Sequence, residues 1–583
     1  MKKVVNYLKN NSVVFITIFT VSLFLVLPQI LNKSLVLGGD SNFHFNRIYD
    51  TYMQLRTGNF NYFQTNFGFQ QSGRIINALY GPGFSYILGL LLVIVHSWFI
   101  FQVVTSFIIF FVSGYSMYLL SRELETPKNI SLMTSILFMS SFWITRWAYN
   151  QNFMTWGIML MPLVIIFCLR MINNNGINLK VLPLALTISL LIQIHVLSAL
   201  MSILVLIIFF IVGMILSTKK IQLLLKCLLA GFLTLVLTFN VWGALIDVYT
   251  SNSLYAPFSF KDMSNYTMNI STGTYDIGHM GLFMSVLLVL QIAFVFIYYK
   301  KMPISEKMLT FVGLIFLVFT SNLIPWTKLA SAVPPLQSFL QFPNRFAGLA
   351  TILLITGFGS SLSKLSSKDL QNMLKLTMLV SCVFILVQSY SDLQKRNETW
   401  NSNQSIVSMH SIDILNKSSN NQIKMAFHSP DLIAGLRISV KPVPDYLPKY
   451  GDELGNTYAA YSRDIVHNKA NITKHVKNGT LVISWSAKNK EEKIHLPVVI
   501  YSNTVLSLNS HRLSKNKLEL STMGTPTIIS TKSGENTLIV NYHSEIITKW
   551  HLIFVIFAWI ISILSLVTIH FISNKQAKNS THK

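Results

Sequence analysis

Thirteen apolar runs occupy most of this chain, and they restrict the fold more than any other feature of the sequence. A transmembrane helix needs about 20 mostly apolar residues. Only 12% of the 583 residues are charged, whereas soluble globular chains carry roughly 25%. Most of the folded surface should therefore face hydrocarbon. The runs lie near 12–31, 78–96, 99–120, 130–147, 153–171, 182–198, 199–216, 223–247, 280–299, 307–323, 346–362, 372–390 and 551–572.

The basic residues indicate which side of the membrane each loop occupies. Net charge is +24, and the excess is scattered through short loops, as the positive-inside rule and contact with anionic lipids predict. No basic helix or patch indicates nucleic-acid binding. Both ends of the chain are basic, with Lys2, Lys3 and Lys9 before the first run and Lys575, Lys578 and Lys583 after the last. We expect both termini in the cytoplasm and no cleaved signal peptide.

Two cytoplasmic termini require an even number of spans, so one of the thirteen runs should not cross. The best candidate is 78–96, which begins with Gly81-Pro82-Gly83, a sequence that discourages a continuous helix. With 78–96 at the outer face, the basic short loops all become cytoplasmic. The sequence therefore predicts twelve spans. The alternative is that 78–96 crosses and another run does not.

This topology divides the chain into three parts with its large loops outside. They are a membrane domain over 1–390, with a first exterior loop at 32–77, a soluble exterior segment over 391–550, and a final span with a cytoplasmic tail over 551–583. Further exterior pieces fall at 248–279 and 324–345. The exterior segment alternates apolar and polar residues between turn-rich stretches, the pattern of a small antiparallel β domain. We expect strands at 480–485, 494–501, 504–508, 527–530 and 537–542.

Few acidic residues lie where they could work at the outer face, and Asp40 is the best placed. It follows the first span and a Gly38-Gly39 turn, and it is expected to cap a helix that runs to about Arg56 and stops at Gly58. His44 and Arg47 would share its helical face. A carboxylate beside a histidine and an arginine at the membrane boundary suits a general base next to an anion site. In the alternative interpretation Asp40 is only a cap.

A second candidate is Arg345, in the motif QFPNRF at 341–346, which ends a proline-rich exterior loop. An arginine at the hydrocarbon edge is costly unless it is paired, and a phosphate is a good bidentate partner. Alternatively, Arg345 reaches lipid headgroups.

Other polar residues carry weaker signals. Asp276 and His279 could bind a metal, but two residues do not make a site, and no metal or other cofactor is expected. His195 is expected to be a packed, hydrogen-bonded residue. The cysteines Cys168, Cys227 and Cys382 lie in or beside apolar runs, so no disulfide framework is indicated.

These features resemble the GT-C superfamily of membrane glycosyltransferases. The first span, the loop that opens with Gly39-Asp40, the YGPG stretch at 80–83 and the multi-span body carry the resemblance. Within it, the chain is similar to bacterial YfhO-like proteins and their relatives labelled 6-pyruvoyl-tetrahydropterin synthase-related. The matching pieces are QFPNRF at 341–346, PDYLP at 444–448 and the β segment before the final span. No three-histidine zinc site or nucleophilic cysteine indicates pterin chemistry.

The resemblance implies an α-helical polytopic fold and transfer of a sugar from a polyprenyl-phosphate donor outside the cytoplasmic membrane. Asp40 matches the first-loop aspartate that serves as base in that superfamily, and Arg345 becomes a phosphate contact by analogy. The chain lacks the paired acids of metal-dependent members. The expected protein is a metal-independent, inverting glycosyltransferase of the bacterial cell membrane, with His44, Arg47 and Arg345 binding substrate and a cell-envelope polymer as acceptor.

Two other functions remain open. A transporter or flippase of lipid-linked saccharide would need polar groups along a path through the bilayer, often with internal repeats, and the sequence shows no repeat and few charges within the runs. A non-catalytic envelope assembly factor with the same body would not depend on Asp40.

Overall fold

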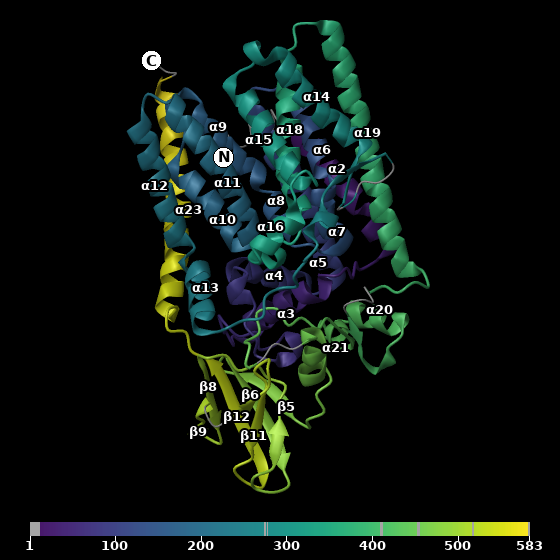
Figure 1. The fold of residues 1–583 in the computed structure, drawn as a ribbon, viewed down its shortest axis with the longest axis vertical. Helices are drawn as coiled ribbons and strands as arrows, with labels where there is room; N and C mark the ends of the chain where they lie inside the picture. The colour runs from purple at the N-terminus through teal and green to yellow at the C-terminus, as the bar shows by residue number, and fades with distance from the viewer. Residues whose placement is uncertain are drawn as a thin grey trace.

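The computed structural model describes residues 12–580, apart from 273–275, 277, 408–411, 452–454 and 516–517; residue 570 and residues 573–580 are described by their backbone only. Lys2, Lys3, Lys9 and Lys583, on which the predicted cytoplasmic termini depend, lie outside the described residues, as do the side chains of Lys575 and Lys578. An elongated helical bundle forms one end of the molecule and a small β-sandwich the other (Figure 1).

The α-helices follow one another along the chain from α2 to α23. They are α2 Ser12–Asn32, α3 Ser41–Thr57, α4 Pro82–Val95, α5 Trp98–Glu123, α6 Lys128–Met139, α7 Phe142–Asn150, α8 Met154–Ile158, α9 Met161–Ile172, α10 Val181–Ile194, α11 Val196–Leu216, α12 Lys220–Leu237, α13 Phe239–Ser251, α14 Leu282–Tyr298, α15 Ile304–Thr320, α16 Trp326–Ala332, α17 Pro335–Phe339, α18 Ala347–Ser363, α19 Lys368–Glu398, α20 Asn420–His428, α21 Ala434–Ile438, α22 Thr457–Tyr461 and α23 Lys549–Ser580.

Nine helical segments are long and apolar enough to cross a membrane within the part of the chain that the structure describes. The predicted fold class, a polytopic α-helical protein with a small β-rich part, is confirmed. The prediction of twelve spans exceeds this number because three runs are shorter or broken. The run 130–147 splits into α6 and α7, α10 ends at Ile194, and α15 has only 17 residues.

The short helix α4 agrees with the expectation that 78–96 does not cross. Its 14 residues rise about 21 Å, less than the roughly 30 Å of a hydrocarbon core. It packs against α3 at the end of the bundle that faces the β-sandwich (Figure 1).

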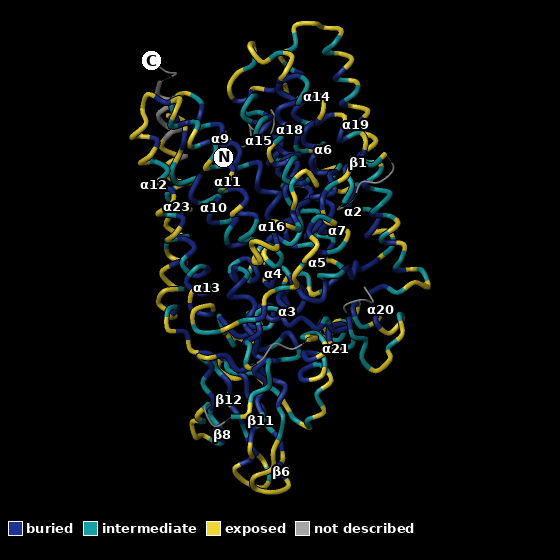
Figure 2. The backbone as a smooth tube through the Cα atoms, viewed as in Figure 1, coloured by how far each residue is buried: buried dark blue, intermediate teal, exposed yellow. Residues whose placement is uncertain are grey.

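Burial separates a central helix from peripheral ones. In α18 and the turn before it, 94% of the most apolar stretch of residues is buried inside the protein. In α23 only 6% of the corresponding stretch is buried. Exposed residues follow the outer sides of α23 and α19 (Figure 2), and many of them are large and apolar, such as Phe554 and Val383. This is the surface expected of helices that face lipid.

The β-sandwich is antiparallel, as predicted. Its five-stranded sheet has the order β5-β6-β12-β8-β9 and its three-stranded sheet the order β10-β11-β7. The strands are β5 Thr473–Lys477, β6 Thr480–Ala487, β7 Lys493–His495, β8 Thr504–Leu508, β9 His511–Arg512, β10 Glu519–Leu520, β11 Pro526–Ile529 and β12 Gly534–Tyr542. Short pairs also form elsewhere, β1 Asn269–Ser271 with β2 His279–Gly281 and β3 Asp413–Ile414 with β4 Ser439–Val440.

One predicted strand differs from the structure. The strand in the structure is Lys493–His495, so only residues 494–495 of the expected strand 494–501 join the sheet ladder. Beyond them the chain approaches the first loop, where the Val499 amide donates to the Ser72 carbonyl at 2.8 Å. Lys474 of β5 reinforces this docking, since its Nζ donates to the carbonyls of Gln70 and Gln71 at 2.9 and 3.1 Å. The sandwich is thus fixed to the loop that carries Asp40.

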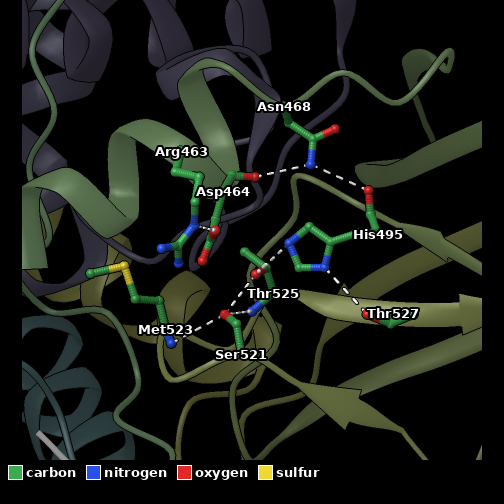
Figure 3. A network of polar contacts seen from close by, with 8 residues as sticks. All are labelled: Arg463, Asp464, Asn468, His495, Ser521, Met523, Thr525 and Thr527. Carbon is green, nitrogen blue, oxygen red and sulfur yellow. Dashed lines mark hydrogen bonds and ion pairs between the residues drawn. The ribbon is translucent and has the colours of Figure 1, made fainter. Parts of the chain in front are cut away.

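A polar network joins the sandwich to the segment before it (Figure 3). Asn468 donates to the backbone carbonyls of Asp464 and His495 at 3.1 and 3.3 Å. The His495 ring contacts the hydroxyls of Thr525 and Thr527 at 3.1 and 3.3 Å. This network holds the turn of π-helix at Ser462–Val466, whose first residue lines the cavity described next.

Candidate functional site

The turn before α3 brings Asp40 to the edge of a cavity. Gly38 is required there, because a Cβ at this position would lie 2.5 Å from the Asn150 Cα. The Ser41 hydroxyl fixes the turn by accepting from the Gly38 amide at 2.8 Å and donating to the Val36 carbonyl at 3.0 Å. The helix runs from Ser41 to Thr57 and stops at Gly58 with φ 70°, as predicted.

Asp40 is the N-cap residue of α3, as predicted, but its side chain makes no capping hydrogen bond. Its carboxylate Oδ1 instead lies 3.2 Å from the Lys441 Nζ. The same ammonium donates to the Gly39 carbonyl. The carboxylate is therefore available to the cavity rather than committed to the helix terminus.

Lys441 determines the charge state of Asp40. Burial alone would raise the pKa of the Asp40 carboxyl, but the Lys441 ammonium, with help from neighbouring cations, outweighs it and lowers the pKa below the ordinary value of 3.8. Lys441 belongs to the exterior segment, which is pinned to α3 where Asn42 donates to the Ser439 carbonyl at 2.6 Å. Asp40 is thus ionised at neutral pH.

His44 and Arg47 lie on the same side of α3 as Asp40, but they occupy different depths. His44 lines the cavity, and burial, followed by the Arg47 charge, lowers its pKa well below 6.5. Arg47 lies behind it, with Nη1 3.2 Å from the His44 Nδ1 and Nε donating to the Asn77 Oδ1 at 3.1 Å. The structure does not bring Arg47 to the cavity wall, so its contact is with His44.

Arg345 reaches the cavity from the turn that precedes α18. Its Nη2 donates to the Gln341 Oε1 at 2.8 Å and its Nη1 to the Phe339 carbonyl at 3.3 Å. Among the described residues it has no carboxylate within ion-pair distance. The negative charge of Asp40 favours the charged form of the Arg345 guanidinium.

Arg146 is a further cation at the site that the sequence analysis missed. It lies on α7, is only 4% exposed, and its guanidinium stands 5.5 Å from the Trp143 ring centroid. Its Nε has no hydrogen-bond partner within the described chain. The sequence did contain a signal for Arg146, because an ionisable residue inside an apolar run such as 130–147 usually marks a functional site.

The cavity has a volume of about 1140 Å³ and lies between the helical bundle and the exterior segment. Aromatic and apolar side chains form much of its wall, as in most small-molecule sites. The ionisable residues of the wall include Asp40, His44, Arg146, His195, Arg345, Asp413, Lys441 and Asp445. The wall thus combines carboxylates with cations from four separate parts of the chain.

Two other residues of the wall bear on its chemistry. Asp445, in the PDYLP motif, has a carboxyl whose pKa burial raises to about 6. His195 lies in the extended link between α10 and α11, where its Nδ1 is 2.8 Å from the Ser198 Oγ. His195 is hydrogen-bonded as expected, and it also faces the cavity.

Asp276 and His279, the weaker metal candidates, contact each other but no third metal-ligating side chain among the described residues. The His279 Nδ1 lies 2.9 Å from the Asp276 Oδ1, and the described residues contain no cluster of three or more His, Cys, Asp or Glu side chains that could hold a metal ion.

No protein-family model and no curated protein sequence matches the chain. Among solved structures, the chain is similar to the oligosaccharyltransferase of Archaeoglobus fulgidus, crystallised with zinc and sulfate. The match has 13% identity and a TM-score of 0.30, covers 71% of this chain, and spans only 57% of the length of that enzyme. An identity this low transfers neither an activity nor a site residue.

Proposed function

We propose that this chain is a membrane glycosyltransferase that moves a sugar from a polyprenyl-phosphate donor to a cell-envelope polymer. The observation that carries the proposal is the cavity itself. In it an ionised carboxylate, Asp40, faces two guanidiniums, Arg146 and Arg345, that have no carboxylate partner among the described residues. A general base beside an anion site is the arrangement that this reaction requires.

The location of the cavity agrees with a donor that stays in the bilayer. The candidate spans Met154–Ile172 and Val196–Leu216 begin at its wall, and residues of the segment 391–550 line its other side. A lipid-phosphate donor would enter from the membrane with its sugar and phosphate in the cavity. The acceptor would approach past the exterior segment, where Asn456, Tyr458 and Ser462 line the wall.

The reaction assigned to these residues is a single displacement. An acceptor hydroxyl loses its proton to the Asp40 carboxylate while its oxygen forms a bond to the anomeric carbon. The bond from that carbon to the phosphate oxygen breaks, and the electron pair leaves with the phosphate. Arg345 stabilises the charge that develops there. Attack opposite the leaving group inverts the configuration at the anomeric carbon.

The decisive experiment replaces Asp40. Asp40→Asn keeps the size of the side chain but removes proton acceptance, and loss of a general base typically lowers the rate about 10²- to 10⁴-fold. The measurement is the envelope glycan content of a deletion strain complemented with each variant at matched protein level. We expect Asp40→Asn to fail to restore the glycan.

Asp431→Asn is the matched control, because Asp431 is an exposed acid outside the cavity wall. It should restore the glycan as well as the parent protein does. Asp50, another acid of α3, is unsuitable, since its buried carboxylate accepts from the Phe67 amide at 2.8 Å and supports the first loop. Full restoration by Asp40→Asn would favour the non-catalytic assembly factor.

A further inference from the structure

Arg146 and Arg345 present two like charges to the same cavity from separate helical elements. Arg146 comes from α7 and Arg345 from the turn before α18, and Arg146 experiences the charge of Arg345. Removing a charge from water costs several kcal/mol unless a partner compensates it. Among the described residues no carboxylate lies within ion-pair distance of either guanidinium, so only the more distant Asp40 carboxylate offsets the two charges.

We infer that Arg146 and Arg345 together form the subsite for the donor phosphate, and that their charges match a lipid monophosphate. The identification of the anion as a lipid phosphate rests on the function proposed above. The pairing of the two arginines around an anion rests on the burial of Arg146, on the position of both residues in the cavity wall and on the ion-pair partners that they lack.

The charge change in the reaction favours a monophosphate. A sugar linked to a lipid through one phosphate is a diester with a charge of about −1, and the released monoester approaches −2. Two guanidiniums therefore match the leaving group better than the intact donor, which is the differential binding that accelerates a reaction. A diphosphate would add a further negative charge to a cavity that already holds Asp40, Asp413 and Asp445.

The aromatic residues around Arg146 keep its guanidinium in place. The Phe142 and Trp143 rings lie 5.6 and 5.5 Å from its central carbon. A planar guanidinium can stack on such rings and still donate in bidentate fashion to a phosphate, which a lysine ammonium cannot do. Arg146→Lys should therefore retain charge but lose part of the binding.

Binding of defined probes tests this without any turnover. The full-length protein, purified in detergent micelles, is titrated with farnesyl phosphate, farnesol, farnesyl diphosphate and inorganic phosphate, with the dissociation constant as readout. Arg146→Gln and Arg345→Gln should each weaken farnesyl phosphate binding about 10- to 100-fold, the range for hydrogen bonds to charged groups. Arg146→Lys should fall between Arg146→Gln and the parent.

Arg437→Gln is the matched control, since Arg437 is exposed and outside the cavity wall. It should leave every constant unchanged. Farnesol should bind equally to all variants, and inorganic phosphate more weakly than farnesyl phosphate. Unchanged farnesyl phosphate binding in Arg146→Gln would overturn the paired subsite. Binding of inorganic phosphate more tightly than farnesyl phosphate would overturn the assignment to a lipid. Binding of farnesyl diphosphate more tightly than farnesyl phosphate would overturn the assignment to a monophosphate.

These outcomes separate the subsite from the proposed function. If Arg146→Gln loses farnesyl phosphate while Asp40→Asn restores the glycan, the subsite stands and the transferase proposal fails. If Asp40→Asn abolishes the glycan while Arg146→Gln binds normally, the transferase proposal stands and the subsite fails.

Discussion

Lys441 and Asp40 form the contact by which the exterior segment acts directly on the proposed catalytic base. The ammonium favours the ionised form of the carboxylate and outweighs the effect of desolvation. The ammonium also occupies one side of the Asp40 carboxylate, the group that an acceptor hydroxyl would approach. The acceptor must therefore reach another lone pair of Asp40 or displace Lys441, and in either case the lysine controls the base.

Replacing Lys441 should change how activity depends on pH. In Lys441→Met the ammonium is lost and burial remains, so the pKa of Asp40 should rise. Since the carboxylate form is the active one, the acidic limb of the pH–rate profile should shift to higher pH. The measurement is the transfer rate of purified protein across pH, with the exposed Lys493→Met as control. An unchanged acidic limb would show that Lys441 does not set the ionisation of Asp40.

Arg345 should respond differently to two substitutions. Arg345→Lys keeps a charge but loses the bidentate fork, so activity should be partly retained. Arg345→Gln loses both the charge and the bidentate fork, so its activity should be lower than that of Arg345→Lys. Glycan content in the complemented deletion strain is the measurement. Equal and full activity in both variants would reduce Arg345 to a residue that reaches lipid headgroups.

Sequence reasoning found Asp40 and Arg345 because both lie beside the ends of predicted spans. Lys441 could not be found in this way, since it lies 401 positions from Asp40 in the chain and meets it only through the docking of the exterior segment. Arg146 was overlooked because a single charge in a long apolar run is easily assigned to a helix end. The N-cap position of Asp40 was predicted, but its side-chain contact with Lys441 in place of a capping hydrogen bond was not.

At the scale of elements, single residues that leave the helical conformation explain where the predicted spans differ from the helices. His195 has extended backbone angles, φ −156° and ψ 102°, and separates α10 from α11. Ser140 and Ser141 separate α6 from α7. Such breaks leave no trace in average hydrophobicity. The first break, His195, itself lines the cavity, and the second precedes α7, which carries Arg146.

The attachment of the sandwich to the bundle depends on a buried carboxylate. Asp247 of α13 accepts from the Tyr542 hydroxyl at 2.9 Å and from the Glu545 amide at 3.2 Å. Tyr542→Phe leaves one carboxylate oxygen without its donor, which should cost about 1–3 kcal/mol. The measurement is the thermal unfolding midpoint in micelles. Tyr266→Phe, at a 38% exposed position, is the control, and equal midpoints for both variants would show that this hydrogen bond does not stabilise the attachment.

At the scale of the whole molecule, the basic loops and the β-sandwich lie at opposite ends. The connections α11–α12 and α18–α19 and the end of α23 lie far from the strands (Figure 1). The first two contain Lys219 and Lys364. From the positive-inside rule we expect this end to face the cytoplasm, with the cavity and the sandwich at the outer face.

Cysteine labelling of intact cells tests this orientation. The labelled positions must be accessible in the fold. Thr57, Asn265 and Asn403 are exposed positions of the predicted exterior, and Thr218 is an exposed position of the predicted cytoplasmic side. We expect cysteines at the first three positions to react with an impermeant thiol reagent.

A cysteine at Thr218 should react only after the cells are permeabilised, because the loop between α11 and α12 lies at the end opposite the sandwich. Native background should be low, since Cys168 and Cys382 are buried and Cys227 is only partly exposed. The parent protein, labelled in parallel, measures that background. If Thr218→Cys labels on intact cells while Asn265→Cys and Asn403→Cys do not, the orientation is inverted. The cavity would then open to the cytoplasm, and transfer to an exterior polymer would be impossible at this site.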